Sequence, residues 1–257
     1  MITVEDIIYN QVENTKKDFD SKNSELLKNV ESEIATAHVV KLIGLFKGAD
    51  FVTENKIYYL SLLLKAENIL ISSFHLVRQR AYIETFSLLR IAIEAIATAI
   101  HISKEKKALN NYLNNTYESP SSIGYSKKFI PLIGEIYGIF SKIAVHMNSK
   151  SYGPQKEIND DELLETIQID FDFRKPNGER DQITLIAIQL VATIVHRAFE
   201  IIFLKEKIYK GQSVLSVPGA DSIILGKQYS DKINELYNKI PTLNENENGC
   251  IRQGFSH

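Results

Sequence analysis

The chain has 257 residues, of which 44% are hydrophobic and 24% are charged, and its 30 basic and 32 acidic side chains give a formal net charge of −2. These values are ordinary for a folded protein with a sizeable core, and the balanced charge does not indicate nucleic acid or an anionic membrane as a partner. Cys250 is the single cysteine, which excludes intrachain disulfides. We therefore expect a cytoplasmic protein.

The N-terminal part of the sequence predicts two consecutive helices. Apolar residues recur at helical spacing as far as Phe46, with a break at residues 20–24, where Asp, Ser and Asn cluster. Gly48 is the expected helix stop.

A long stretch without glycine or proline follows, from Thr53 to Pro120. We predict an antiparallel helical hairpin here, with helices at residues 56–77 and 82–107 and a turn at residues 78–81. One long kinked helix is the alternative. The second helix is apolar around most of its circumference, which is typical of a helix in the middle of a bundle.

The C-terminal half alternates loops with further helices. The composition of residues 118–126 predicts a loop, and a helix is then expected to run from Ser126 or Lys127 to His146. Strict alternation over residues 166–173 indicates a strand, with room for one small β-hairpin. We expect Asp181 to cap a long helix at residues 182–207. The prediction is thus a single all-α bundle at residues 1–240 with long buried central helices, followed by a disordered tail at residues 241–257.

Two apolar stretches are long enough to be considered as membrane spans, at residues 82–102 and 183–204. Charged or polar side chains interrupt both of them, and such groups are costly in lipid. We therefore expect no membrane-spanning segment. The interrupting residues are Glu84, Arg90 and Glu94 in the first stretch and His196, Arg197 and Glu200 in the second.

A narrow polar stripe runs along the central predicted helix. It consists of Ser87, Arg90, Glu94, Ala97 and His101, spaced i, i+3, i+7, i+10 and i+14. One interpretation is a solvated face with i, i+4 ion pairs between Arg90 and Glu94 and, towards the N-terminus, between Arg80 and Glu84.

The second interpretation of the stripe is an internal cleft. Arg90 would then bind an anion, and His101 would act as an acid, a base or a ligand. His146, at the end of its predicted helix, is placed to reach the same cleft. The candidate catalytic residues are accordingly Arg90, Glu94, His101 and His146.

Recognised metal, nucleophile and phosphate motifs are missing from the sequence. His196 and Glu200 have the i, i+4 spacing of paired metal ligands, but no His-Glu-x-x-His motif and no cysteine partner accompanies them. A core histidine beside a helical carboxylate is the favoured interpretation. We expect no metal and no cofactor.

Two segments resemble uncharacterised bacterial helical proteins. These proteins carry an L-[LI]-R-x3-E helix, matched by SLLRIAIEA at residues 87–95, and a later S-x4-H, matched by SKIAVH at residues 141–146. They resemble, distantly, the helical HEPN domains of toxin–antitoxin and phage-defence systems. HEPN ribonucleases use Arg-x4–6-His on a helix, and the match here, from Arg252 to His257, lies in the predicted tail.

The function expected from the sequence is a non-catalytic binding or assembly module in the bacterial cytoplasm. Its partner is unknown, and a protein partner or a second copy of the chain would suit this role. The resemblance implies a link to defence. The alternative is a HEPN-like ribonuclease or another hydrolase acting through the Arg/Glu/His cluster.

Overall fold

The computed structural model describes residues 4–47, 54–144, 178–203, 231–232 and 235. The helices with described bounds are α1 (Val4–Lys22), α2 (Ser24–Lys47), α3 (Glu54–Val77), α4 (Tyr82–Lys104), α5 (Lys106–Leu113), α6 (Ser119–Ser126), α7 (Ile133–Ala144) and α10 (Gly178–Phe203).

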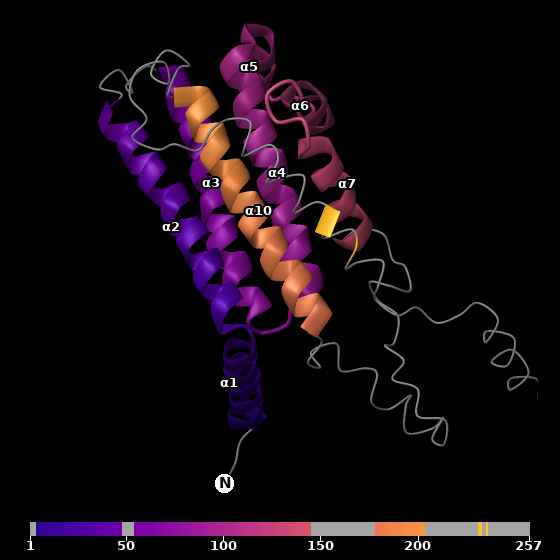
Figure 1. The fold of residues 1–257 in the computed structure, drawn as a ribbon. Coiled ribbons are helices and arrows are strands. Elements are labelled where there is room, and N and C mark those ends of the chain that lie inside the picture. Colours follow the sequence, from indigo (N-terminus) through magenta and orange to yellow (C-terminus); the bar gives the residue numbers. More distant parts are fainter. Residues whose placement is uncertain (1–3, 48–53, 145–177, 204–230, 233–234, 236–257) are drawn as a thin grey trace, which may run out of the picture.

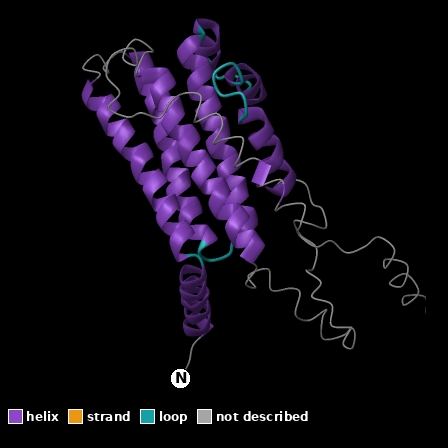
Figure 2. Ribbon diagram, viewed as in Figure 1, coloured by secondary structure: helices purple, strands orange, loops and turns teal. Residues whose placement is uncertain are grey.

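The described part of the chain is all-α, which confirms the predicted fold class (Figure 2). The long helices α2, α3, α4 and α10 lie side by side, α1 extends from one end, and α6 and α7 flank α4 (Figure 1). Helices α3 and α4 form the predicted hairpin with its turn at residues 78–81. The predicted strand, His146 and the predicted tail lie outside the described residues.

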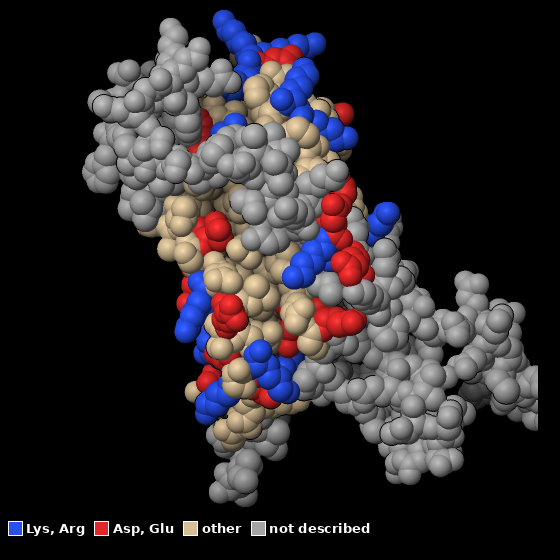
Figure 3. Space-filling view, in the orientation of Figure 1, with Lys and Arg blue, Asp and Glu red and all other residues tan. Residues whose placement is uncertain are grey.

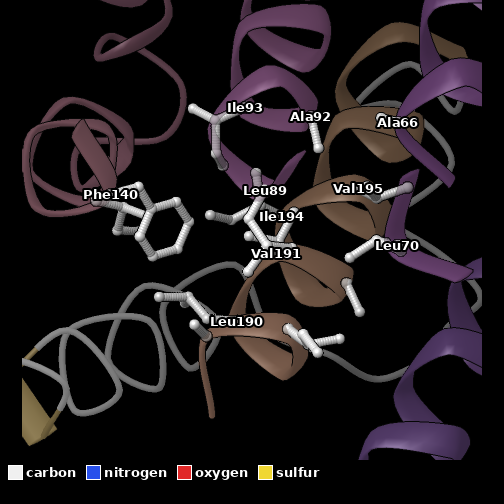
Figure 4. Packing of buried hydrophobic residues seen from close by; sticks show 14 of the residues in the cluster. Ala66, Leu70, Leu89, Ala92, Ile93, Phe140, Leu190, Val191, Ile194 and Val195 are labelled. Atoms are coloured by element: carbon white, nitrogen blue, oxygen red, sulfur yellow. The ribbon is translucent and has the colours of Figure 1, made fainter. Parts of the chain in front are cut away.

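The core is centred on α4, which contacts α3 and α10 on one side and α6 and α7 on the other. Leu89 and Ile93 of α4 point towards Val191 of α10 and Phe140 of α7 (Figure 4). All four are buried, and each fully buried aliphatic side chain contributes roughly 1.5–3 kcal/mol to folding. The apolar circumference of the α4 sequence is therefore explained by neighbours on several sides.

The predicted loop at residues 118–126 is wrong, because residues Ser119–Ser126 form α6. Pro120 occupies the first turn, where proline costs no helical hydrogen bond. Ile123 is buried, and the Ser126 hydroxyl donates a hydrogen bond of 3.0 Å to the Ala97 carbonyl of α4. Packing against α4 thus overrides the loop-like composition. The next helix, α7, begins at Ile133, later than predicted.

The expectation of a cytoplasmic protein without membrane-spanning segments is contradicted. By length and composition alone, three helices can cross a membrane, at Asn55–Val77, Tyr82–Lys104 and Gly178–Phe203, and most of the apolar window is buried in the last two. This finding points towards a membrane protein. The interrupting charges cost less than their number suggests, because Arg90 and Glu94 pair with each other.

Charges of both signs are interspersed on the described face of the molecule (Figure 3). Apolar and neutral residues lie between them, and no single sign covers the face. This distribution agrees with the formal net charge of −2.

Candidate functional site

The polar stripe of α4 is divided between two sets of contacts, the first around Arg90 and Glu94. Arg90 Nη2 lies 2.9 Å from Glu94 Oε1 and donates a hydrogen bond of 2.9 Å to the Tyr137 hydroxyl of α7. That hydroxyl donates in turn to Glu94 Oε1 at 2.8 Å. The Arg90 and Glu94 side chains are 30% and 25% exposed, so this part of the stripe is neither a solvated face nor a sealed cleft.

His101, further along the stripe, is buried and has partners of its own. Its Nδ1 lies 2.8 Å from the Tyr117 hydroxyl and its Nε2 lies 2.8 Å from Glu105 Oε2. The ring stacks on Tyr125 at a centroid distance of 4.2 Å. With the proton on Nε2, His101 donates to Glu105 and accepts from Tyr117, which satisfies both ring nitrogens.

A cavity of about 570 Å³ opens beside the stripe, between α3, α4 and α5. We call it the tyrosine cavity, because Tyr58, Tyr112 and Tyr117 all line it. The other lining residues are Leu62, Lys65, Ile91, Glu94, Ala95, Thr98, Leu113, Asn115 and Ser119. Two of these, Ile91 and Leu113, are large apolar side chains that are 37% and 42% exposed.

The three tyrosine rings lie next to one another around the cavity, with Tyr112 between Tyr58 and Tyr117. The ring centroids of Tyr58 and Tyr112 are 6.3 Å apart with an interplanar angle of 71°. Those of Tyr112 and Tyr117 are 6.0 Å apart at 78°. Burial raises the pKa of the Tyr117 hydroxyl, which therefore remains protonated and able to donate at neutral pH.

A second hollow of about 390 Å³ shares Tyr117 with the tyrosine cavity. His101, Glu105 and Ser121 are among its lining residues. The structure therefore brings Arg90 together with Glu94, and places Glu94 and His101 in the linings of two different hollows. His146 lies outside the described residues.

An ion network lies at the start of α4, where α3 turns into α4, and it is buried except at Asp18, whose side chain is 38% exposed. Arg80 Nη2 donates to Asp18 Oδ2 at 2.8 Å, and Arg80 Nε lies 3.5 Å from Asp181 Oδ1. Tyr82 donates its hydroxyl proton to Asp181 Oδ1 at 2.5 Å, and Asn23 Nδ2 donates to Asp181 Oδ2 at 3.2 Å. We call these five residues the Arg80 network.

The Arg80 network corrects two sequence predictions. The recorded ion-pair partners of Arg80 are Asp18 and Asp181, whereas Glu84, the predicted partner, is exposed on α4. Asp181 lies inside α10 with its side chain 2% exposed, so it is a buried acceptor and not the predicted helix cap. The φ angle of Arg80 is 57°, which turns the chain between α3 and α4.

The charges of this network affect one another. Hydrogen bonds from Lys22 and Arg80 lower the pKa of Asp18. Burial by itself would lower the pKa of Arg80, but the Asp18 hydrogen bond and the Asp181 charge outweigh burial and raise it. Both groups are therefore charged at neutral pH.

The His196–Glu200 pair is a buried structural contact, as the sequence favoured. Its atoms Nε2 and Oε1 are 3.3 Å apart, and Arg197 Nη1 lies 2.7 Å from Glu200 Oε2. Within the described residues, no group of three His, Cys, Asp or Glu side chains is placed to hold a metal ion.

The tyrosines that build the site were not predicted from the sequence. Tyr137 comes from α7, Tyr58 from α3 and Tyr112 from α5, and only tertiary packing brings them near α4. The sequence indicates these tyrosines only weakly. Tyr112 and Tyr117 flank a short polar segment that follows the central helix.

The comparisons with known proteins give no relative for this chain: no family model, no curated protein and no solved structure matches it. The resemblance to HEPN domains therefore stays a prediction.

Proposed function

We propose that this protein is a non-catalytic binding module that holds a small molecule in the tyrosine cavity. The observation that carries the proposal is the cavity itself. It has a volume of about 570 Å³, three tyrosine rings, exposed apolar side chains and one carboxylate. Small-molecule sites typically have volumes of about 300–1,000 Å³ and combine apolar or aromatic walls with a few placed polar groups.

The walls of the cavity are held in place by contacts made outside it. Glu94 is fixed by Arg90 and Tyr137, and the Tyr117 hydroxyl is fixed by His101. A site whose polar groups are already positioned loses little side-chain entropy when a ligand binds. This arrangement favours recognition of a ligand.

One observation favours a catalytic alternative. Glu105, His101 and Tyr117 form a continuous carboxylate–imidazole–hydroxyl chain with two contacts of 2.8 Å. Such a chain can orient a general base. The Arg90, Glu94, His101 and His146 grouping expected from the sequence is not what supports this alternative, since His101 has separate partners.

The binding proposal is tested by blocking the cavity. Ser119 is exposed and lines the tyrosine cavity, and Ser119→Trp places an indole at that position. Ser121, two residues along α6, lines the second hollow instead, so Ser121→Trp is a matched control.

The measurement is ligand-observed NMR with a library of small molecules on the full chain in a maltoside detergent. We expect a set of molecules that bind the wild type and Ser121→Trp but not Ser119→Trp. If Ser119→Trp, correctly folded, retains every binder, the cavity is not the binding site.

A further inference from the structure

The geometry points to a chemical class of ligand for the tyrosine cavity: we infer that it binds a small organic cation, an amine or a substituted ammonium. Tyr58, Tyr112 and Tyr117 would enclose the cation, with Glu94 as its counter-charge. This inference rests on the proposed binding function and specifies the ligand of the same site.

The arrangement of the three tyrosine rings favours a cation. Successive rings meet at 71° and 78°, so neighbouring tyrosine rings are steeply inclined to one another and are not stacked in parallel. Electron-rich ring faces attract a cation, and several faces meeting at steep angles are the arrangement that recognises substituted ammonium groups. A planar neutral ligand would instead favour parallel faces on which to stack.

The position of the Glu94 carboxylate also favours a cation. Glu94 lines the cavity, whereas Arg90 is not among its lining residues. The Arg90 guanidinium lies 5.2 Å from the centre of the Tyr137 ring, on the α7 side of Glu94. The contacts that the described residues make with this carboxylate all fall on Oε1. Oε2 therefore remains as an acceptor for a ligand.

Lys65 brings a positive charge to the same cavity, since it is one of the lining residues and is exposed on α3. Its ammonium is carried on a long flexible stem and can turn away from the rings, so it weakens a cation site without abolishing it. A ligand that carries both an ammonium and a peripheral anionic group would contact both residues.

The probe for the test is choline, and its control is 3,3-dimethyl-1-butanol, which has the same shape with carbon in place of the charged nitrogen. Isothermal titration of the full chain in a maltoside detergent measures both. We expect choline to bind about tenfold more tightly than the alcohol, because only the charged probe interacts electrostatically with the rings and Glu94.

Two variants assign the effect to the named residues. Glu94→Gln keeps the size of the side chain and removes its charge, and Tyr112→Leu removes one aromatic wall from α5. Each should weaken choline binding by about tenfold and leave the affinity for the alcohol nearly unchanged. A thermal midpoint for each variant verifies that the fold is intact, and Tyr112→Leu provides the result if Glu94→Gln is unstable.

The outcomes separate the ligand class from the binding function. Equal affinity for choline and the alcohol, or no effect of either variant, overturns the cation inference. If choline fails while neutral library molecules are lost specifically in Ser119→Trp, the binding function stands and the ligand class is wrong. If no molecule depends on the cavity, both are wrong.

Discussion

Polar clusters of opposite character lie at the start of α4 and from its middle onward, and we call these the closed end and the open end. At the closed end, the Arg80 and Asp181 side chains are each 2% exposed, and charges of both signs are paired. At the open end, Glu94 and three tyrosines border the tyrosine cavity, and the Arg90–Glu94 pair is only half-buried. A closed network of paired charges fixes the geometry of the chain, whereas an open one leaves aromatic faces and a carboxylate oxygen for another molecule.

The comparison predicts the largest loss of stability at the closed end. Arg80→Met removes the guanidinium, keeps the length of the side chain and leaves Asp181 buried without its cation. The free energy of unfolding should fall by roughly 3–5 kcal/mol. The denaturant midpoint measures this loss, and a change below about 1 kcal/mol would show that the network is solvated.

The double variant Arg80→Met/Asp181→Leu sharpens this result. It removes both buried charges, and so should recover part of the loss. Recovery should be incomplete, because the Tyr82 hydroxyl loses its acceptor and the Asn23 amide keeps only the Phe19 carbonyl.

At the open end, Arg90→Ala should have a smaller effect. The pair with Glu94 is part-exposed, but Arg90 also contacts the Tyr137 ring and hydroxyl. A loss of roughly 1–2 kcal/mol in the free energy of unfolding is expected. A loss as large as that of Arg80→Met would remove the distinction between the two ends.

Acid titration addresses the closed end in another way. The pKa of Asp18 is lowered in the fold, first by Lys22 and then by Arg80. The stabilisation of the fold by ionised Asp18 is therefore present at neutral pH. It is lost as the pH falls through the pKa of Asp18 in the folded protein, which lies below the ordinary 3.8. Asp18→Asn should flatten the dependence of thermal stability on pH below about pH 5. Lys22→Met should do the same to a smaller extent. If thermal stability falls at acid pH in both variants as it does in the wild type, this account is contradicted.

The smallest expected effect concerns Lys65. Replacing it with methionine removes a like charge from the lining of the tyrosine cavity. Choline affinity should rise only about twofold, because the flexible lysine can already turn its charge away from the ligand. Weaker binding in Lys65→Met would mean that the lysine contacts the ligand, as expected for a ligand with an anionic group.

Helical periodicity was sufficient to predict the bundle, the α3–α4 hairpin and the burial of α4. It failed for α6, because the Ser, Pro and Gly composition of residues 118–126 resembles a loop until α4 is packed against it. It also failed for the membrane criterion, since Arg90 and Glu94 were judged as separate charges and not as a pair.

Only part of the site could be predicted from the sequence. The stripe identified Arg90, Glu94 and His101 as unusual on an apolar helix, and all three take part in specific contacts. Glu94 and His101 line two different hollows, and Tyr117 lies in the linings of both. Such a position depends on how α5 and α6 fold back onto α4, and no local pattern indicates it. Asp181 was predicted to be a cap because an aspartate near a helix start usually is one, and only the packing of α10 beside Arg80 and Tyr82 makes it a buried acceptor.

The central claim is that the open end of α4 binds a ligand and the closed end does not. Tyrosine-selective labelling of the full chain tests this in one NMR titration, because Tyr58, Tyr112 and Tyr117 line the cavity while Tyr82 belongs to the Arg80 network. Tyr→Phe variants assign the four signals. We predict that choline, or any library molecule lost in Ser119→Trp, shifts the three cavity tyrosines and leaves Tyr82 unchanged. Shifts at Tyr82 with none at the other three would contradict the claim.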